Sequence, residues 1–203
     1  MPLHLGETFG QIDIYLFDQL LRGRIRPGMR VLDAGCGGGR NLVFLLREGY
    51  DVVACDAEPG AIEDVRRLAA RLAPALPASN FRVERIEGMT FESESVDAVV
   101  SSAVLHFARD EAQFEAMVHE MWRVLRPRGI MFARLASTIG IESEVRPLGA
   151  RRFRLPDGSD RFLVDADRLS AAERTLGAER LDPLKTTVVQ NQRSMTTWVI
   201  RKP

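Results

Sequence analysis

The residues best suited to chemistry are two acidic side chains, Asp33 and Asp56, that each end a short apolar run. Between them lie Gly35, Gly37 and Gly39, which allow a ligand to approach the backbone because glycine has no Cβ. A carboxylate at position 33 would repel a diphosphate and attract a cationic amine. An acidic residue about 20 residues past a glycine turn can bind both hydroxyls of a ribose. The pattern therefore predicts a nucleoside ligand that carries a cationic group and no phosphates.

A dinucleotide such as NAD is the alternative ligand for a glycine-rich turn. Its fingerprint is Gly-x-Gly-x-x-Gly, and counting from Gly35 and Gly37 the last position is Arg40. The missing third glycine and the nearby acid both weaken the pyrophosphate interpretation, and an NAD-binding Rossmann protein remains the alternative.

Composition limits the class of protein. The 203 residues include 28 basic and 28 acidic side chains and are 45% hydrophobic, which favours one globular domain over residues 1–203 and no net attraction to nucleic acid or anionic lipid. No apolar run approaches the roughly 18 residues that span a bilayer, and the first residues do not resemble a signal peptide. Two cysteines and three histidines lack the spacing of a zinc site. We expect a cytoplasmic protein with a small-molecule substrate and without a metal, nucleic-acid or membrane partner.

Strand-like and helix-like segments alternate along the chain. Expected strands lie at residues 29–33, 51–55, 81–85, 96–101 and 130–135, and expected helices at 41–48, 59–73, 110–125 and 165–176. Such alternation favours a parallel sheet with helices on both faces. Apolar spacing over 9–24 predicts a covering helix, and residues 146–161 are expected to be an arginine-rich loop. Runs at 180–190 and 195–202 predict an antiparallel hairpin at the sheet edge.

Three motifs in order along the chain resemble the class I S-adenosylmethionine-dependent methyltransferases. The acid at Asp33 followed by Gly-x-Gly-x-Gly resembles their first motif, residues 95–107 resemble the fourth strand and the turn after it, and residues 123–129 resemble the turn before the fifth strand. The segments 37–41 and 49–52 are similar to the small bacterial branch that includes the tellurite-resistance methyltransferases.

The resemblance covers about residues 9–137 and implies a fold and a reaction. The implied fold is a Rossmann-like, doubly wound α/β fold with a mostly parallel seven-stranded sheet, an antiparallel C-terminal hairpin and helices on both faces. The implied activity is methyl transfer from S-adenosylmethionine to a small molecule by in-line displacement. A non-enzymatic S-adenosylmethionine-binding regulator is the alternative from another class.

The resemblance also implies roles for individual residues. Asp33 would contact the methionyl amino group, and Asp56 would hold the ribose with Ala57 beside the adenine. The family often has an acid after the third strand, where this chain has Arg85, so Ile86 would offer its backbone N–H to the adenine, with Glu84 or Glu87 as substitutes. The complete expected set of cofactor-binding residues is Asp33, Gly35, Cys36, Gly37, Asn41, Asp56, Ala57, Ile86, Ser101 and Ser102.

Other residues concern the methyl acceptor. His106 follows the fourth expected strand and is the candidate base if the acceptor is a hydroxyl, although a packing histidine is an equally open interpretation. Tyr15, in the covering segment 1–28, either closes the pocket or belongs to the core. Residues 138–164 are expected to form a substrate lid in which Arg152 and Arg154 bind an anionic acceptor. Alternatively, these arginines are solvated surface.

Overall fold

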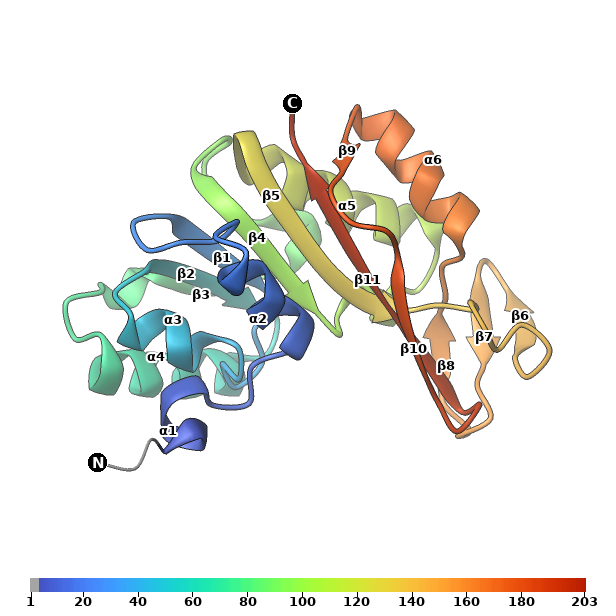
Figure 1. Ribbon diagram of the computed structural model, residues 1–203, viewed down its shortest axis with the longest axis horizontal. Coiled ribbons are helices and arrows are strands. Elements are labelled where there is room, and N and C mark those ends of the chain that lie inside the picture. Colours follow the sequence, from blue (N-terminus) through green and yellow to red (C-terminus); the bar gives the residue numbers. More distant parts are fainter. Residues whose placement is uncertain (1–3) are drawn as a thin grey trace.

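The chain folds around one twisted sheet that carries both of the acidic residues singled out above. The computed structural model describes residues 4–203 (Figure 1). The strands of the main sheet are β1 (Arg30–Ala34), β2 (Asp51–Asp56), β3 (Phe81–Val83), β4 (Val96–Ser102), β5 (Leu125–Ala136), β9 (Glu179–Arg180), β10 (Lys185–Val189) and β11 (Arg193–Arg201). Their order is β10-β11-β5-β4-β1-β2-β3, with β9 paired to β11 off this path.

Strand directions match the expected fold class. The pairs β1–β2, β1–β4, β2–β3 and β4–β5 are parallel, whereas β11 is antiparallel to both β5 and β10. The path of seven strands with an antiparallel C-terminal hairpin is the predicted Rossmann-like arrangement, which is therefore confirmed.

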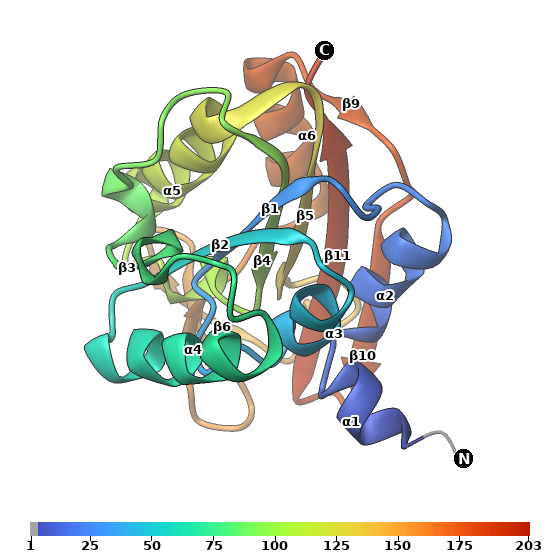
Figure 2. The same cartoon turned by 90° about the vertical axis from the view of Figure 1, so that its left-hand side faces the viewer.

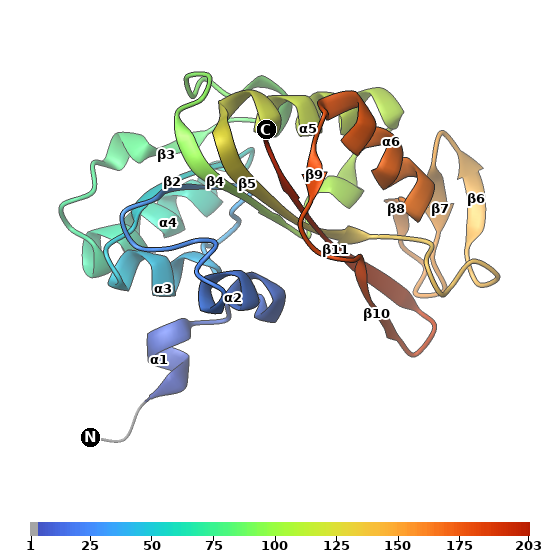
Figure 3. The same ribbon diagram turned by 45° about the horizontal axis from the view of Figure 1, so that its top comes forward.

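Helices cover both faces of this sheet (Figures 2 and 3). The α-helices are α1 (Leu5–Phe9), α2 (Ile14–Leu21), α3 (Leu42–Arg47), α4 (Pro59–Leu72), α5 (Glu111–Val124) and α6 (Ala166–Leu176), and short 3₁₀ turns lie at Ala78–Asn80, Ile86–Gly88 and Leu105–Phe107. Figure 3 shows α2, α3 and α4 on one side of the sheet and α5 and α6 on the other.

Side-chain alternation along the strands explains this three-layer arrangement. Val31 packs into the core on the side of α2, α3 and α4, and its neighbour Leu32 packs into the core on the side of α5 and α6. Successive strand residues point to opposite faces, so a strand with helices on both sides carries apolar residues on both of its faces. Each fully buried Val or Leu stabilises the fold by about 1.5–3 kcal/mol relative to exposure.

Two segments differ from the sequence-based expectation. The predicted helix over 9–24 is instead the shorter helix α2, because Gly10, with φ of +62°, ends the preceding α1 and Asp13 begins α2 by accepting a hydrogen bond from the Tyr15 N–H. The first three residues of the predicted covering segment lie outside the described residues. The expected arginine-rich loop is instead a small antiparallel sheet of β6 (Arg146–Gly149), β7 (Arg152–Arg154) and β8 (Asp160–Phe162).

The parallel strands bring the chemistry-bearing residues to one edge. Parallel neighbours end at the same side of a sheet, and ligands of open α/β sheets bind there. Asp56, Ser102 and Ala136 are the last residues of β2, β4 and β5, and the glycine turn follows Ala34 at the end of β1. The small sheet lies beyond this edge, beside the β10–β11 hairpin (Figure 1).

Candidate functional site

The glycine turn after β1 forms an open face at the carboxyl edge. Gly35, Gly37 and Gly39 have φ of +80°, +50° and +79°, the left-handed region that favours glycine. The N–H of Gly35 donates to the Cys55 carbonyl at 2.9 Å, which ties the turn to β2. A Cβ at Gly37 would have no heavy atom within 4 Å. The open face borders a cavity of about 1000 Å³, which we call the glycine-turn cavity.

Asp56 connects this turn to the end of β2. Its Oδ2 accepts from the Gly37 N–H at 2.8 Å and its Oδ1 accepts from the Glu58 N–H at 3.0 Å. A carboxylate oxygen has two lone pairs, so Asp56 can hold the turn and still accept from a ligand. Asp56 and Ala57 both line the glycine-turn cavity.

Asp33 is a buried carboxyl group without a hydrogen-bond partner among residues 4–203. Its side chain is 1% exposed, and both of its oxygens are unpaired. Burial raises the pKa of Asp33 to about 7, while the nearby Arg40 cation opposes and Asp56 reinforces the rise. Asp33 lies behind the glycine turn, outside the residues that line the cavity. An unpaired buried carboxylate is costly unless a cation or donor reaches it, so the site is suited to a cationic ligand group.

A second cavity, of about 170 Å³, continues past Asp56 and is called here the Ile86 cavity. Ile86 is buried in its wall. Glu87 is held there by the Gln113 amide, whose Nε2 donates to Glu87 Oε1 at 2.8 Å, and Arg85 pairs with the same carboxylate. Sequence reasoning missed Gln113 and Met117 of α5, which line this cavity. Their i, i+4 spacing on one helix face was the available signal.

Asp13 links the N-terminal segment to the cavity wall and was also missed. Its N–H donates to Asn41 Oδ1 at 3.0 Å, and its Oδ2 accepts from Ser102 Oγ and from Arg134 Nη1, both at 3.1 Å. Arg40 completes the cluster by donating to Ser102 Oγ at 2.8 Å. The predicted residues Asn41 and Ser102 are thus brought together beside the glycine-turn cavity, which both line.

Three other predicted residues have different surroundings. Cys36 lines the glycine-turn cavity, where burial and the nearby acids raise the pKa of its thiol. Ser101 is fully buried next to the cavity residue Ser102 and does not line the cavity. Tyr15 does not line any of the cavities described here, and its hydroxyl bonds to Thr187 Oγ1 at 2.7 Å, which ties α2 to β10.

A third cavity, of about 450 Å³, lies between the main sheet and the small sheet. We call it the arginine cavity, because four arginines and one aspartate line it together with His106: Arg40, Arg134, Arg161, Arg193 and Asp157. It shares Arg40, Ala103 and Phe107 with the glycine-turn cavity. Phe107 is 58% exposed although it is a large aromatic residue. Two binding spaces therefore meet at these three residues.

The arginines of the small sheet divide between its two faces. Arg152 and Arg154 pair in register with Phe162 and Asp160, whereas Arg161 pairs with Phe153. Successive strand residues alternate in direction, so Arg161 lines the arginine cavity while Arg152 and Arg154 do not. Arg152 donates to the Ala108 carbonyl, and the exposed Arg154 pairs with Asp160. The structure does not bring the two predicted lid arginines to any of the three cavities at the carboxyl edge.

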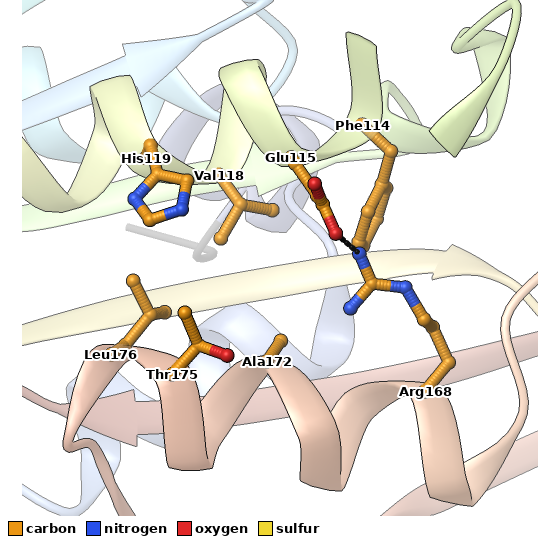
Figure 4. Close-up of a pocket in the computed structure, with 8 residues that line it drawn as sticks. All are labelled: Phe114, Glu115, Val118, His119, Arg168, Ala172, Thr175 and Leu176. Atoms are coloured by element: carbon orange, nitrogen blue, oxygen red, sulfur yellow. Dashed lines mark hydrogen bonds and ion pairs between the residues drawn. The ribbon is translucent and has the colours of Figure 1, made fainter. Parts of the chain in front are cut away.

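A smaller crevice lies between α5 and α6, away from the carboxyl edge (Figure 4). Its volume is about 80 Å³, below the roughly 300–1000 Å³ of small-molecule sites. Glu115 and Arg168 form an ion pair at 3.0 Å at one end, and His119 lies at the other. This crevice is a packing gap between two helices, distinct from the three cavities at the carboxyl edge.

Within residues 4–203, no helix is long and apolar enough to cross a membrane. Across the same part of the chain, no three His, Cys, Asp or Glu side chains gather as a metal site would require.

Comparison with known proteins places this geometry in context. Residues 32–133, half of the chain, match the family described as "Methyltransferase domain". The chain is 33% identical over 120 residues to the uncharacterized methyltransferase YodH of Bacillus subtilis, a match that covers 59% of this chain and 46% of that protein. It is 30% identical over 214 residues to the ubiquinone biosynthesis O-methyltransferase of Mesorhizobium japonicum, covering 99% of this chain and 81% of that protein.

The fold comparison agrees with the sequence comparison. A crystal structure of 1,6-didemethyltoxoflavin-N1-methyltransferase from Burkholderia thailandensis, with bound 1,6-didemethyltoxoflavin and S-adenosylhomocysteine, superimposes with a TM-score of 0.70. The match covers 92% of this chain and 75% of that one at 19% identity, so it concerns the fold alone. The chain spans less than half of the length of several curated relatives that it matches, including YodH.

Proposed function

Because the chain belongs to the family of S-adenosylmethionine-dependent methyltransferases, we propose that it transfers the methyl group of this cofactor to a small anionic acceptor bound in the arginine cavity. The observation that carries the proposal is the junction at Arg40, Ala103 and Phe107, where the arginine cavity meets the glycine-turn cavity. A methyl donor in the glycine-turn cavity and a methyl acceptor in the arginine cavity would face each other there.

The residues around the glycine turn fit the chemical groups of S-adenosylmethionine. The unpaired Asp33 carboxylate suits its α-ammonium, and Asp56 suits its ribose hydroxyls. The backbone of Gly35 and Gly37, with Cys36, Asn41 and Ser102, would hold the methionine portion, with Ser101 behind them. The Ile86 cavity, with Ala57 at its border, would hold the adenine. These assignments are part of the proposal.

The chain supplies alignment and exclusion of water. When bound, the cofactor supplies a methyl group already activated by a positively charged sulfur. Catalysis then depends on holding the nucleophile in line with that methyl group. Val104 covers Gly35 so closely that a Cβ on the glycine would lie 2.6 Å from Val104 Cγ1, and Phe107 lines all three cavities. These two side chains would close the site around the reacting atoms.

The charge of the arginine cavity supports an anionic acceptor. Asp157 pairs with Arg193 at 2.5 Å and Asp13 pairs with Arg134 at 3.1 Å. Among residues 4–203, no carboxylate lies within 4 Å of the Arg161 guanidinium. The guanidinium lies over the Phe107 ring, with its central carbon 4.9 Å from the ring centroid. A guanidinium fork recognises carboxylate and other oxyanion geometry. We propose that residues 138–164, which carry Arg161, act as the lid over the acceptor.

Several narrower expectations stay predictions. They are the likeness to the tellurite-resistance branch, a cytoplasmic location, a role for Arg152 and Arg154 in substrate binding, and a role for Tyr15 in closing the pocket. The family match does not favour an NAD-binding protein or a non-enzymatic S-adenosylmethionine-binding regulator.

A turnover assay tests the proposed function. Release of S-adenosylhomocysteine is measured with matched anionic and neutral acceptors of the same carbon skeletons. We expect release with anionic acceptors, and we expect Arg161→Ala to lower kcat/KM by roughly tenfold to a hundredfold, the effect of losing about 1.5–3 kcal/mol from a charged hydrogen bond. The exposed Arg174 of α6 serves as the control, and Arg174→Ala should leave the rate unchanged.

Two results would contradict the proposal. Tight cofactor binding without turnover of any acceptor would support the alternative function, a non-enzymatic S-adenosylmethionine-binding regulator. Preference for neutral acceptors, with Arg161→Ala as active as the wild type, would remove the arginine cavity as an anion site. A loss of rate in Arg154→Ala would instead support the lid role predicted for Arg154.

A further inference from the structure

We propose that the acceptor's nucleophile is an ionised carboxylate, which is methylated to its ester without a base, and that His106 donates a hydrogen bond to it through Nε2. The inference rests on the proposed function and deepens it, since it names the reacting group of the acceptor. It depends on which proton-accepting groups the arginine cavity contains.

The hydrogen bonding of His106 defines its tautomer. His106 is 7% exposed, lines the arginine cavity, and its Nδ1 accepts a hydrogen bond from the Ala136 N–H at 3.4 Å. A neutral imidazole has one donor nitrogen and one acceptor nitrogen. With Nδ1 as the acceptor, Nε2 carries the proton. An Nε2–H group can donate a hydrogen bond to the substrate that is to be methylated, but it cannot take a proton from that substrate.

The charges around His106 keep it neutral. Burial, with Arg161 and Arg193 nearby, lowers the pKa of His106 to about 4. The wall also carries Arg40 and Arg134. A buried histidine beside these two guanidinium groups is a poor proton acceptor at neutral pH, because burial and the nearby positive charge both disfavour its imidazolium form.

The carboxylates near the cavity are equally unsuited to act as bases. Asp157 accepts from the N–H and the Oγ of Ser159 and from Arg193, and these bonds lower the pKa of Asp157 to about 2. Asp13 is buried and bonded to Arg134 and Ser102. Each of these carboxylates already has cationic and neutral donors. An alcohol or phenol acceptor would therefore have no group in the cavity wall to receive its proton.

An ionised carboxylate needs no proton acceptor and matches the cations of the wall. One of its oxygens can accept from the Arg161 guanidinium while the other, facing the junction at Phe107, attacks the methyl group. A thiolate is also ionised, but its single acceptor atom cannot bind a guanidinium fork and present a second nucleophilic atom. The arrangement favours the carboxylate.

The reaction balances without a base. A lone pair of the carboxylate oxygen forms the new C–O bond to the methyl carbon, and the C–S bond breaks with its electron pair retained by sulfur. The sulfonium becomes a neutral thioether and the carboxylate becomes a neutral methyl ester. No proton is transferred, and the neutral product loses its attraction to Arg161, which favours its release.

The first test is nuclear magnetic resonance of the intact protein with ¹⁵N-labelled histidine. We expect His106 as the Nε2–H tautomer at pH 7, with protonation only below about pH 5. The Nδ1–H tautomer, or titration near pH 7, would overturn the inference. This readout needs no acceptor and does not depend on the proposed function.

The second test uses S-[methyl-³H]adenosylmethionine with a panel of aliphatic and aromatic carboxylic acids and the matched alcohols, phenols and thiols. We expect label that alkali releases as volatile methanol, the property of a methyl ester, and only from the acids. Formation of ether or thioether products without ester, or no ester from any acid, would overturn the inference. If turnover to those other products occurs, the proposed methyltransferase function still stands, whereas a lack of cofactor binding in a parallel titration would refute that function itself.

Variants of His106 separate a donor from a base. His106→Gln keeps an N–H donor, so its kcat/KM should stay within about fivefold of the wild type, whereas His106→Ala should fall by roughly tenfold, the loss of one hydrogen bond of about 1.4 kcal/mol. With S-adenosylmethionine saturating at every pH, so that ionisation of Asp33 does not affect the measurement, both rates should be constant from pH 6 to pH 9. Equal and large losses in the two variants, with a wild-type rate that rises through a pKa near 7, would identify a base.

Discussion

Replacing Asp33 with asparagine should stabilise the fold and weaken cofactor binding at the same time. Burial raises the pKa of Asp33 to about 7 from its usual 3.8, so between these values the folded chain binds one proton more than the unfolded chain. Stability from this group is therefore fully present below about pH 4 and is lost as the pH rises through 7. Each pH unit corresponds to about 1.4 kcal/mol. Relative to pH values below about 4, the raised pKa of Asp33 should lower the free energy of unfolding by about 4 kcal/mol at pH 8, where the folded side chain is ionised, and by about 2 kcal/mol at pH 5, where the side chain is ionised only in the unfolded chain.

Urea unfolding at the two pH values measures this difference. The uncharged variant Asp33→Asn should be more stable than the wild type by up to about 4 kcal/mol at pH 8. At pH 5 this stability difference should shrink to about 2 kcal/mol. Calorimetry should show weak, pH-independent affinity of Asp33→Asn for S-adenosylmethionine. As a control, Asp51→Asn removes a half-exposed carboxylate at the start of β2 that pairs with Arg30, and should change stability by less than about 1 kcal/mol.

The outcome that would refute this reasoning is a stability difference that is the same at pH 5 and pH 8, or a variant less stable than the wild type at pH 8. Either result would mean that Asp33 has a partner in the folded chain. Unchanged cofactor affinity in Asp33→Asn would remove Asp33 from the binding site.

Three further substitutions probe the contacts of the site. Asp56→Ala should weaken S-adenosylmethionine binding by about 1–3 kcal/mol in calorimetry, because a charged hydrogen-bond acceptor is lost, and unchanged affinity would exclude it from the site. Gly35→Ala should lower the melting temperature and the affinity, because its Cβ would lie 2.6 Å from a neighbouring side chain at a φ of +80°, whereas Gly38→Ala should do neither, since nothing lies within 4 Å there. Asp13→Ala should lower the free energy of unfolding in urea by about 3–5 kcal/mol, because it leaves Arg134 without its carboxylate, and a loss below about 1 kcal/mol would show that the cluster is not stabilising.

Much of the fold could be predicted because its signals are local. The strands β1, β2 and β4 are buried on both faces, so they read as short continuous apolar runs, and Asp33 and Asp56 mark where two of these runs end. The position of both acids at one edge then follows from the geometry of parallel strands. The glycine turn could also be predicted, because left-handed φ values favour glycine.

The acceptor side could not be predicted in the same way. Whether Arg152 or Arg161 faces the arginine cavity depends on the register of β7 against β8. A shift of one residue in this register moves every side chain of the strand to the opposite face of the sheet. Asp13 and Arg134 are 121 positions apart, so no local pattern joins them. The break at Gly10 is hidden in the sequence because the apolar periodicity continues across it.

Calorimetric titration of the intact protein with S-adenosylmethionine, with NAD as the comparison ligand, is the decisive test of which cofactor the glycine-turn cavity binds. We expect one binding site for S-adenosylmethionine per chain, affinity that rises between pH 6 and pH 8 as Asp33 ionises, and no detectable NAD binding. Tight binding of NAD with none of S-adenosylmethionine would contradict this expectation.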